Sequence, residues 1–152
     1  MRTFMHGLSG TLAALTFALA GCQQLPLTPE DVQARKFEAI PDKAVIYVVR
    51  DNPDFSEAEA AITLGDNLRM RTYPGTYYRW EVPPGTHQVM SFGGDTGLIR
   101  VQAERGRIYF VQQRVGGNPR APESRFELVG ESQGRAIVLR SVLLKPAQPI
   151  VN

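Results

Sequence analysis

The sequence has few of the residues that build covalent or metal-linked scaffolds, and it carries no excess of one charge. One cysteine and two histidines among 152 residues exclude an internal disulfide framework and any metal site made of several thiolates. Lysine and arginine number 17 against 15 acidic residues, so the formal net charge is only +2, which excludes the strongly basic surface typical of nucleic-acid-binding proteins. A content of 43% hydrophobic and 21% charged residues indicates one globular domain.

The first 22 residues have the pattern of an export signal. Arg2 precedes an uncharged apolar stretch, Leu8 to Ala20, which is shorter than the roughly 18 residues that a membrane-spanning helix needs. The stretch ends in Leu19-Ala20-Gly21-Cys22, which resembles the bacterial lipobox. The resemblance implies cleavage between Gly21 and Cys22, removal of residues 1–21, and attachment of a diacylglycerol and a further acyl chain, such as palmitate, to Cys22. Several acyl chains give stable membrane anchoring, so Cys22 is predicted to be an anchor and not a nucleophile.

Gln23 bears on localisation. By resemblance to enterobacterial lipoproteins, an aspartate after the lipidated cysteine favours retention in the inner membrane, whereas glutamine favours the periplasmic face of the outer membrane. We therefore expect a lipid-anchored protein of the bacterial cell envelope. The alternatives at Cys22 are a buried core cysteine and an ordinary secretory signal.

The rest of the chain is expected to be a tether followed by one domain. Residues 22–42 would hold the lipidated cysteine, a polar tether and a short helix, residues 43–145 a β-sandwich, and residues 146–152 a C-terminal tail. The segment Thr28-Pro29-Glu30-Asp31 has a threonine suited to cap a helix, proline at the first helical position and acids in the first turn. It predicts a short helix that continues to about Lys36.

Apolar alternation bounded by glycine and proline turns predicts a mainly β domain. The near-continuous run of β-forming residues 44–50, which lacks alternation, predicts a central strand covered on both faces. In the strand 76–82, Tyr78, Trp80 and Val82 share one face and are expected to lie in the core. The pattern is typical of an antiparallel β-sandwich of about seven to nine short strands with one or two short helices. The expected strands are 44–50, 61–64, 68–71, 76–82, 86–92, 98–103, 108–114 and 125–129, with a helix and a last strand within 131–144.

Several connections and one helical glycine also carry predictions. The acidic segment 51–59 is interpreted as a solvated connection, and Gly93-Gly94-Asp95-Thr96-Gly97 as a hairpin connection, because it lacks the lysine and the following helix of a phosphate-binding loop. Gly116-Gly117-Asn118-Pro119 predicts the start of a long loop, and Gly134 weakens the prediction of a helix after residue 131.

Three segments, Lys43 to Arg50, Gly75 to His87 and Gly106 to Val111, resemble a family of small bacterial lipoproteins that carry a domain of unknown function. The core of that family is similar to PEGA-type domains, which are small β-sandwich modules. The resemblance covers about residues 43–140. It implies the sandwich fold, but no established activity and no catalytic residues.

The residues suited to catalysis are few and scattered. His87 is the only histidine beyond the signal segment, and no Gly-x-Ser-x-Gly motif accompanies it, so we expect its ring to hydrogen-bond a turn carbonyl and to pack. The acids Glu81, Asp95, Glu104 and Glu127 are spread along the chain. Glu81 alternates with arginine along its strand and is expected to form a cross-strand ion pair. We therefore expect no enzyme, no metal and no cofactor.

Arginines on two predicted strands suggest an interaction face. Arg69 and Arg71 share an outward parity with Tyr77 and Arg79, provided that the strands 68–71 and 76–82 are neighbours. Such a face would stack on sugars, bind carboxylates or form a protein interface. The alternative is an ordinary solvated sheet face.

These observations favour a membrane-anchored envelope lipoprotein with a non-catalytic interaction or structural role. The partners expected are the membrane, through the acyl chains on Cys22, and an envelope protein or peptidoglycan. The alternative is a cell-wall glycan-binding module or a carboxylate-dependent carbohydrate enzyme, and the enzyme predicts a concave cleft with paired carboxylates about 5 to 10 Å apart.

Overall fold

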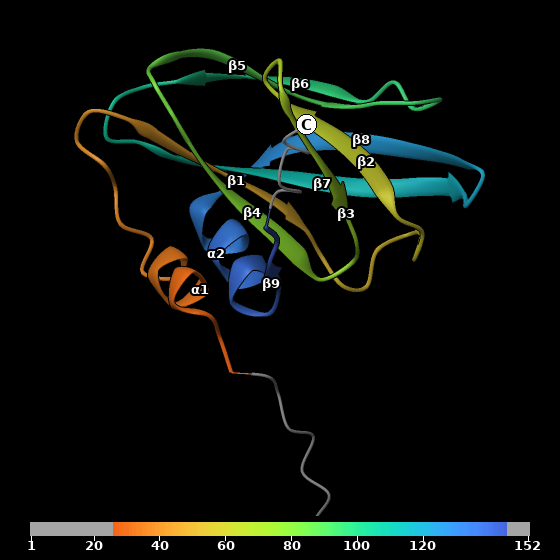
Figure 1. Cartoon of the computed structure of the whole chain (residues 1–152), viewed down its shortest axis with the longest axis horizontal. Helices are drawn as coiled ribbons and strands as arrows, with labels where there is room; N and C mark the ends of the chain where they lie inside the picture. Colours follow the sequence, from red (N-terminus) through yellow and green to blue (C-terminus); the bar gives the residue numbers. More distant parts are fainter. Residues whose placement is uncertain (1–25, 146–152) are drawn as a thin grey trace, which may run out of the picture.

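The computed structural model describes residues 26–145, in which the strands form two facing sheets. One sheet has the strand order β8-β7-β1-β4-β9 and the other β3-β2-β5-β6. Figure 1 shows β5 and β6 of the four-stranded sheet above the five-stranded sheet, with both helices below. The predicted mainly β, sandwich-like fold with two short helices is confirmed. The signal segment, with Gly21 and Cys22, and the predicted tail lie outside the described residues.

The bounds of most elements agree with the sequence pattern within one or two residues. The segment 93–97 joins β5 to β6 as a hairpin connection, as predicted. In chain order the elements are α1 (Pro29–Ala34), β1 (Ala44–Arg50), β2 (Ala60–Leu64), β3 (Leu68–Thr72), β4 (Thr76–Val82), β5 (Gly85–Ser91), β6 (Leu98–Ala103), β7 (Ile108–Asn118), β8 (Ala121–Val129), α2 (Glu131–Leu139) and β9 (Val142–Leu143).

Strand β1 is the centre of the fold, and all seven of its residues are buried. One face, which includes Ile46 and Val48, contributes to the apolar core between the two sheets. Val82 of β4 is buried in the same core, and Tyr78 and Trp80 pack against it. The prediction of a central strand covered on both faces is therefore confirmed, and so is the inward placement of this side of β4.

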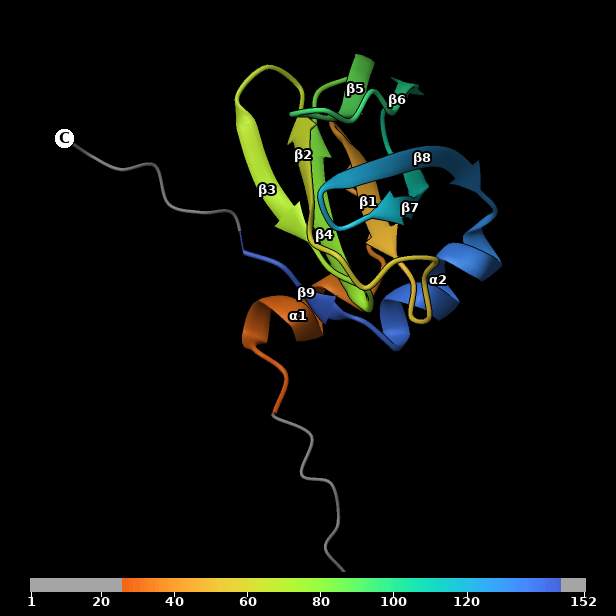
Figure 2. The same ribbon diagram turned by 90° about the vertical axis from the view of Figure 1, so that its right-hand side faces the viewer.

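The helices cover the opposite face of the five-stranded sheet. Tyr47 and Val49 of β1 form a second core with Phe110 and with Ile137 of α2. Figure 2 shows both helices below this sheet, away from the four-stranded one. Thr28 caps α1, because its Oγ1 accepts a hydrogen bond from the Asp31 backbone N–H at 3.2 Å. The cap agrees with the prediction, and the helix ends at Ala34, two residues earlier than expected.

Two features of the five-stranded sheet differ from the prediction. Two strand pairs, β1 with β7 and β4 with β9, are parallel rather than antiparallel. The long loop expected at residues 116–119 is instead the end of β7 and a tight turn into β8. The Asn118 side chain stabilises that turn, since its Oδ1 accepts hydrogen bonds from the backbone N–H groups of Arg120 and Ala121.

Candidate functional site

The predicted face of arginine and tyrosine does not exist as one surface. Arg69 and Arg71 lie on β3 of the four-stranded sheet, whereas Tyr77 and Arg79 lie on β4 of the other sheet. The turn at residues 73–75 carries the chain from one sheet to the other, so β3 and β4 are not hydrogen-bonded neighbours. The prediction failed because strand parity gives the face of a strand but not its sheet.

Tyr77 is a core residue and is fully buried. Its hydroxyl donates a hydrogen bond to Asp31 Oδ1 at 2.7 Å, and burial together with this bond raises the pKa of Tyr77. Asp31 is itself buried and also accepts from Arg35 Nε at 2.5 Å. Burial disfavours the charged form of Asp31, but the hydrogen bonds from Arg35 and Tyr77 outweigh it and lower its pKa. This cluster attaches α1 to the sheet and offers no group to a partner.

The three arginines of the predicted face each contact a different neighbour within the protein. Arg69 lies over the ring of Phe92, 5.4 Å from its centroid, and Arg71 pairs with Glu59. Arg79 pairs with Glu81 on its own strand, and this hydrogen bond is the main reason that the pKa of Glu81 is lowered. The predicted cross-strand ion pair of Glu81 forms as well, because Nζ of Lys43, next to the start of β1, lies 3.5 Å from Glu81 Oε2.

His87 has the structural role predicted for it. Its Nε2 lies 2.7 Å from the carbonyl oxygen of Pro83, and its ring meets Trp80 edge-on at a centroid distance of 5.4 Å. Among the acids, Asp95 accepts hydrogen bonds from backbone N–H groups and Glu127 pairs with Arg114. Within residues 26–145 no group of three or more histidine, cysteine or acidic side chains is placed to hold a metal ion.

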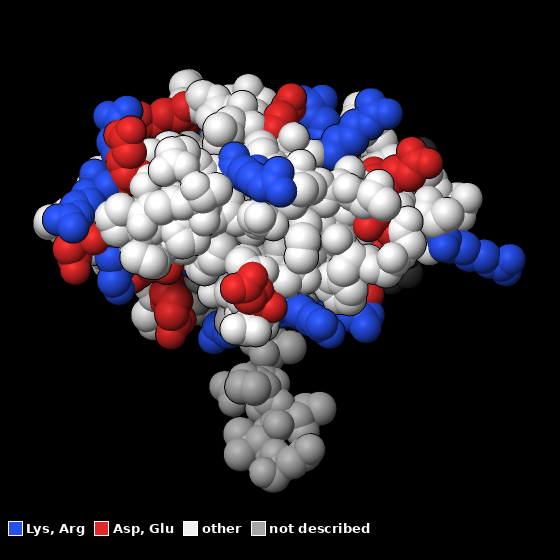
Figure 3. All heavy atoms as spheres, turned by 90° about the horizontal axis from the view of Figure 1, so that it is seen from above, with Lys and Arg blue, Asp and Glu red and all other residues white. Residues whose placement is uncertain are grey.

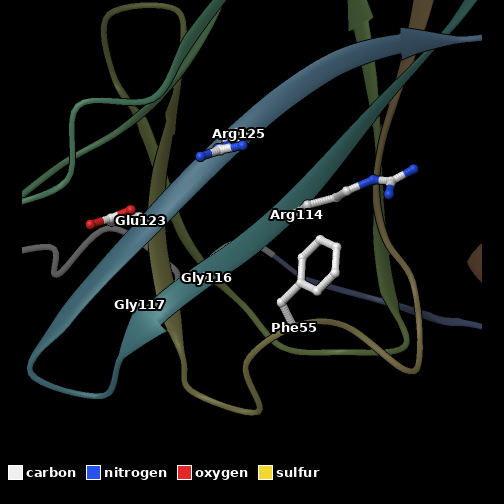
Figure 4. A pocket seen from close by; sticks show the side chains of 6 residues that line it. All are labelled: Phe55, Arg114, Gly116, Gly117, Glu123 and Arg125. Carbon is white, nitrogen blue, oxygen red and sulfur yellow. The ribbon is translucent and has the colours of Figure 1, made fainter.

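A groove beside Phe55 is the feature that the sequence did not reveal. Two hollows of about 270 Å³ each adjoin there and share Phe55 and Arg114 as walls. Figure 4 shows the Phe55 ring next to β7, with Arg114 extending from β7 and Arg125 and Glu123 projecting from β8. We call these hollows together the Phe55 groove. Its lining residues are Asp51, Pro53, Asp54, Phe55, Gln112, Arg114, Gly116, Gly117, Glu123, Arg125 and Gln133.

The loop that carries Phe55 is held by a buried ion pair. Arg50, whose side chain is fully buried, donates from Nε to Asp54 Oδ2 at 2.7 Å and from its terminal nitrogens to the carbonyls of Thr72 and Ser56. Asp54 Oδ2 also accepts from the Val115 backbone N–H at 3.0 Å. The prediction of a solvated connection at 51–59 is therefore wrong for Asp54, whose side chain is almost fully buried.

The floor of the groove is the face of the β7–β8 hairpin that extends past α2. Arg114 pairs in register with Arg125, and Gly116 pairs with Glu123. A Cβ at Gly116 would meet only one backbone oxygen, 4.0 Å away, so the glycine leaves the floor open. At the α2 end, Gln133 donates to Gln112 Oε1 at 2.9 Å.

A third hollow adjoins the Phe55 groove at β8. It has a volume of about 320 Å³ and lies between the 93–97 connection and the same Glu123 and Arg125. Asp95 fixes this connection, since its Oδ1 accepts from the Gly97 backbone N–H and its Oδ2 from the Ser124 N–H at 2.8 Å. The three hollows therefore adjoin through shared side chains.

The comparisons with known proteins do not place the chain in a family. No protein-family model matches it, and no curated protein matches it either.

In the described part of the chain, no helix is both long enough and apolar enough to cross a membrane. Figure 3 shows acidic and basic side chains interspersed on the face seen from above, without a large area of one sign.

Proposed function

We propose that this chain is a membrane-anchored lipoprotein of the bacterial envelope, whose β-sandwich is a non-catalytic binding module. The observation that carries the proposal is the sequence Leu19-Ala20-Gly21-Cys22 directly after an uncharged apolar stretch. The resemblance of segments within residues 43–140 to small lipoproteins with a PEGA-like core agrees with it. Gln23 favours the outer membrane.

The position of Cys22 relative to the domain supports a tethering mechanism. Cys22 precedes Thr28, the cap of α1, by only six residues, a length of chain that spans about 20 Å at most. An acyl chain on Cys22 would therefore keep the domain close to the bilayer. Confinement of this kind raises the effective concentration of the module toward neighbouring envelope components.

The acids form ion pairs and hydrogen bonds within the protein, and this favours a binding function over catalysis. A glycosidase needs two carboxylates that face each other across the bond to be cleaved. Of the acids considered from the sequence, Glu81 and Glu127 form ion pairs, and both oxygens of Asp95 accept backbone hydrogen bonds. The Phe55 groove combines an exposed ring with arginine, amide and acidic side chains. Two of its acids, Asp51 and Asp54, are held in ion pairs with arginines, so the groove suits recognition of a ligand.

Expression of the full chain in an enterobacterial host, with intact-mass analysis and membrane fractionation, tests the proposal. We expect the wild-type mature chain to begin at Cys22, to carry acyl mass and to fractionate with the outer membrane. Cys22→Ser should lose the acyl mass, and Gln23→Asp should keep it but move toward the inner membrane. A wild-type chain without acyl mass would overturn the anchor.

A further inference from the structure

The backbone at Phe55 is held in place, and its side chain is left uncovered. Its exposed fraction is 76%, the largest among the large hydrophobic side chains in residues 26–145. Such a ring usually lies in a core or at an interface. The neighbouring Asp54 is fixed by Arg50 on one side and by the backbone of β7 on the other. The fold therefore presents an apolar surface at a defined position, which lowers the entropy lost when a ligand packs on it.

The charges around the groove are nearly balanced. Arg114 pairs with Glu127 at 3.0 Å, and Asp51 pairs with Arg140 at 2.6 Å. Arg125 and Glu123 form no ion pair within the described part of the chain, and they carry opposite signs. A ligand of high charge would gain little here, whereas a neutral ligand rich in hydroxyl groups would find both donors and acceptors.

The neighbouring sheet edge is closed to an added peptide strand at its middle. Strand β8 is the outer strand of its sheet, and its Ser124 N–H is already bound to Asp95. A Cβ at Gly97 would collide with the Ser124 carbonyl, so the 93–97 connection lies directly against this edge. Recognition of a peptide by strand addition requires free backbone groups along an edge. The groove therefore favours a ligand that is bound by side chains of this protein rather than by the backbone of β8.

We propose that the Phe55 groove binds a neutral glycan chain, with one sugar ring packed on Phe55. This inference rests on the proposed function, because anchoring in the envelope places the module beside cell-wall glycan. The guanidinium of Arg125 lines one of the two hollows that share Phe55 and the amide of Gln133 lines the other, and both would hydrogen-bond sugar hydroxyls. The third hollow, which shares Arg125, extends the row and suits a chain of several sugars.

The test uses the mature acylated protein in detergent and two saccharide probes. Cosedimentation with insoluble cell-wall sacculi is measured first, and then its competition by soluble oligosaccharides of β-1,4-linked N-acetylglucosamine or by free stem peptides. The variants are Phe55→Ala and Arg125→Ala. Phe92→Ala is the matched control, because Phe92 is an exposed phenylalanine that does not line the groove.

We expect Phe55→Ala to weaken the affinity for sacculi about ten-fold, which corresponds to about 1.4 kcal/mol. Phe92→Ala should change it by less than about two-fold, as is usual for a surface residue outside a binding site. The oligosaccharide should compete with the sacculi. Equal binding by Phe55→Ala and wild type, or absence of binding by the wild-type protein, would overturn the glycan site. Competition by stem peptides alone would assign the groove to a peptide and also overturn it. Acylation is read by mass on the same preparation, so failure of the anchor is recognised separately.

Discussion

Substitution of Gly134 by alanine tests how α2 packs on the sheet. Gly134 lies inside α2, is buried and faces Phe110. Helix propensity alone predicts that alanine stabilises an interior helical position by about 1 kcal/mol relative to glycine. The structure predicts the opposite sign. A Cβ at this position would lie 2.5 Å from Phe110 Cβ and closer still to Cγ and Cδ1, whereas ordinary contact begins at 3.4 Å.

The energetic consequence follows from what must move. Phe110 is 2% exposed and belongs to the core that includes Tyr47 and Ile137, so its ring has no free space to enter. Relief requires α2 to shift by roughly 1 Å, and overpacking of this kind costs typically about 1–3 kcal/mol. The overlap involves three atoms of Phe110, so we take the upper part of this range, about 2–3 kcal/mol. After subtraction of the propensity gain of about 1 kcal/mol, Gly134→Ala should be destabilised by about 1–2 kcal/mol.

Urea denaturation of the purified full chain, followed by circular dichroism, measures this difference. Gly94→Ala is the matched control, because a Cβ there meets nothing within 4 Å and its backbone φ is not positive. That variant should be unchanged or stabilised by up to about 1 kcal/mol through the lower entropy of its unfolded chain. A Gly134→Ala protein as stable as the wild type would refute the packing of α2 described above.

Two buried ion pairs give further predictions. The folded-state pKa of Asp31 lies below its ordinary value of 3.8. The contribution of the Asp31 carboxylate to the free energy of unfolding is therefore fully present above pH 3.8 and is lost as the pH falls through the folded-state pKa. Asp31→Asn should therefore cost about 3 kcal/mol at pH 7 and less near pH 3, which urea titrations at several pH values would show; a difference independent of pH would contradict the role given to the carboxylate. Arg50→Leu leaves Asp54 buried without its partner and should cost about 3–5 kcal/mol in the same assay, whereas Arg71→Leu, at an exposed pair, should cost less than about 1 kcal/mol. A similar loss of unfolding free energy in both arginine variants would contradict the larger contribution assigned to the buried pair.

The strands were predictable because their signals are local. A continuous run of β-forming residues locates β1, and period two with the flanking turns locates β4 and β6. The turn chemistry of Thr28 and Pro29 locates the start of α1. The extension of β7 through Gly116 and Gly117 was not predictable in the same way, since a glycine pair usually ends a strand. Here the long pairing with β8 and the turn capped by Asn118 outweigh that preference.

The position of the candidate site depends on long-range pairing, which local patterns do not specify. Asp54 is one of several acids in a polar segment, and nothing in the sequence distinguishes it from its solvated neighbours. Its burial results from Arg50, a charged residue at the end of an otherwise apolar strand. An arginine that interrupts a buried run is the one local sign that a carboxylate must lie close to it, because an unpaired buried charge is costly.

The parallel pairing of β1 with β7 explains why the groove forms where it does. The carboxyl ends of two parallel strands lie at the same edge of a sheet, and Arg50 at the end of β1 stands opposite Gln113 of β7. The segment that follows β1, with Phe55, is therefore placed beside the part of β7 that continues through Arg114 and Gly116. In a wholly antiparallel sheet the same segment would meet the beginning of β7 near Ile108, and Phe55 would lie far from both groove arginines. The orientation of a single strand pair thus decides whether this fold has the candidate site.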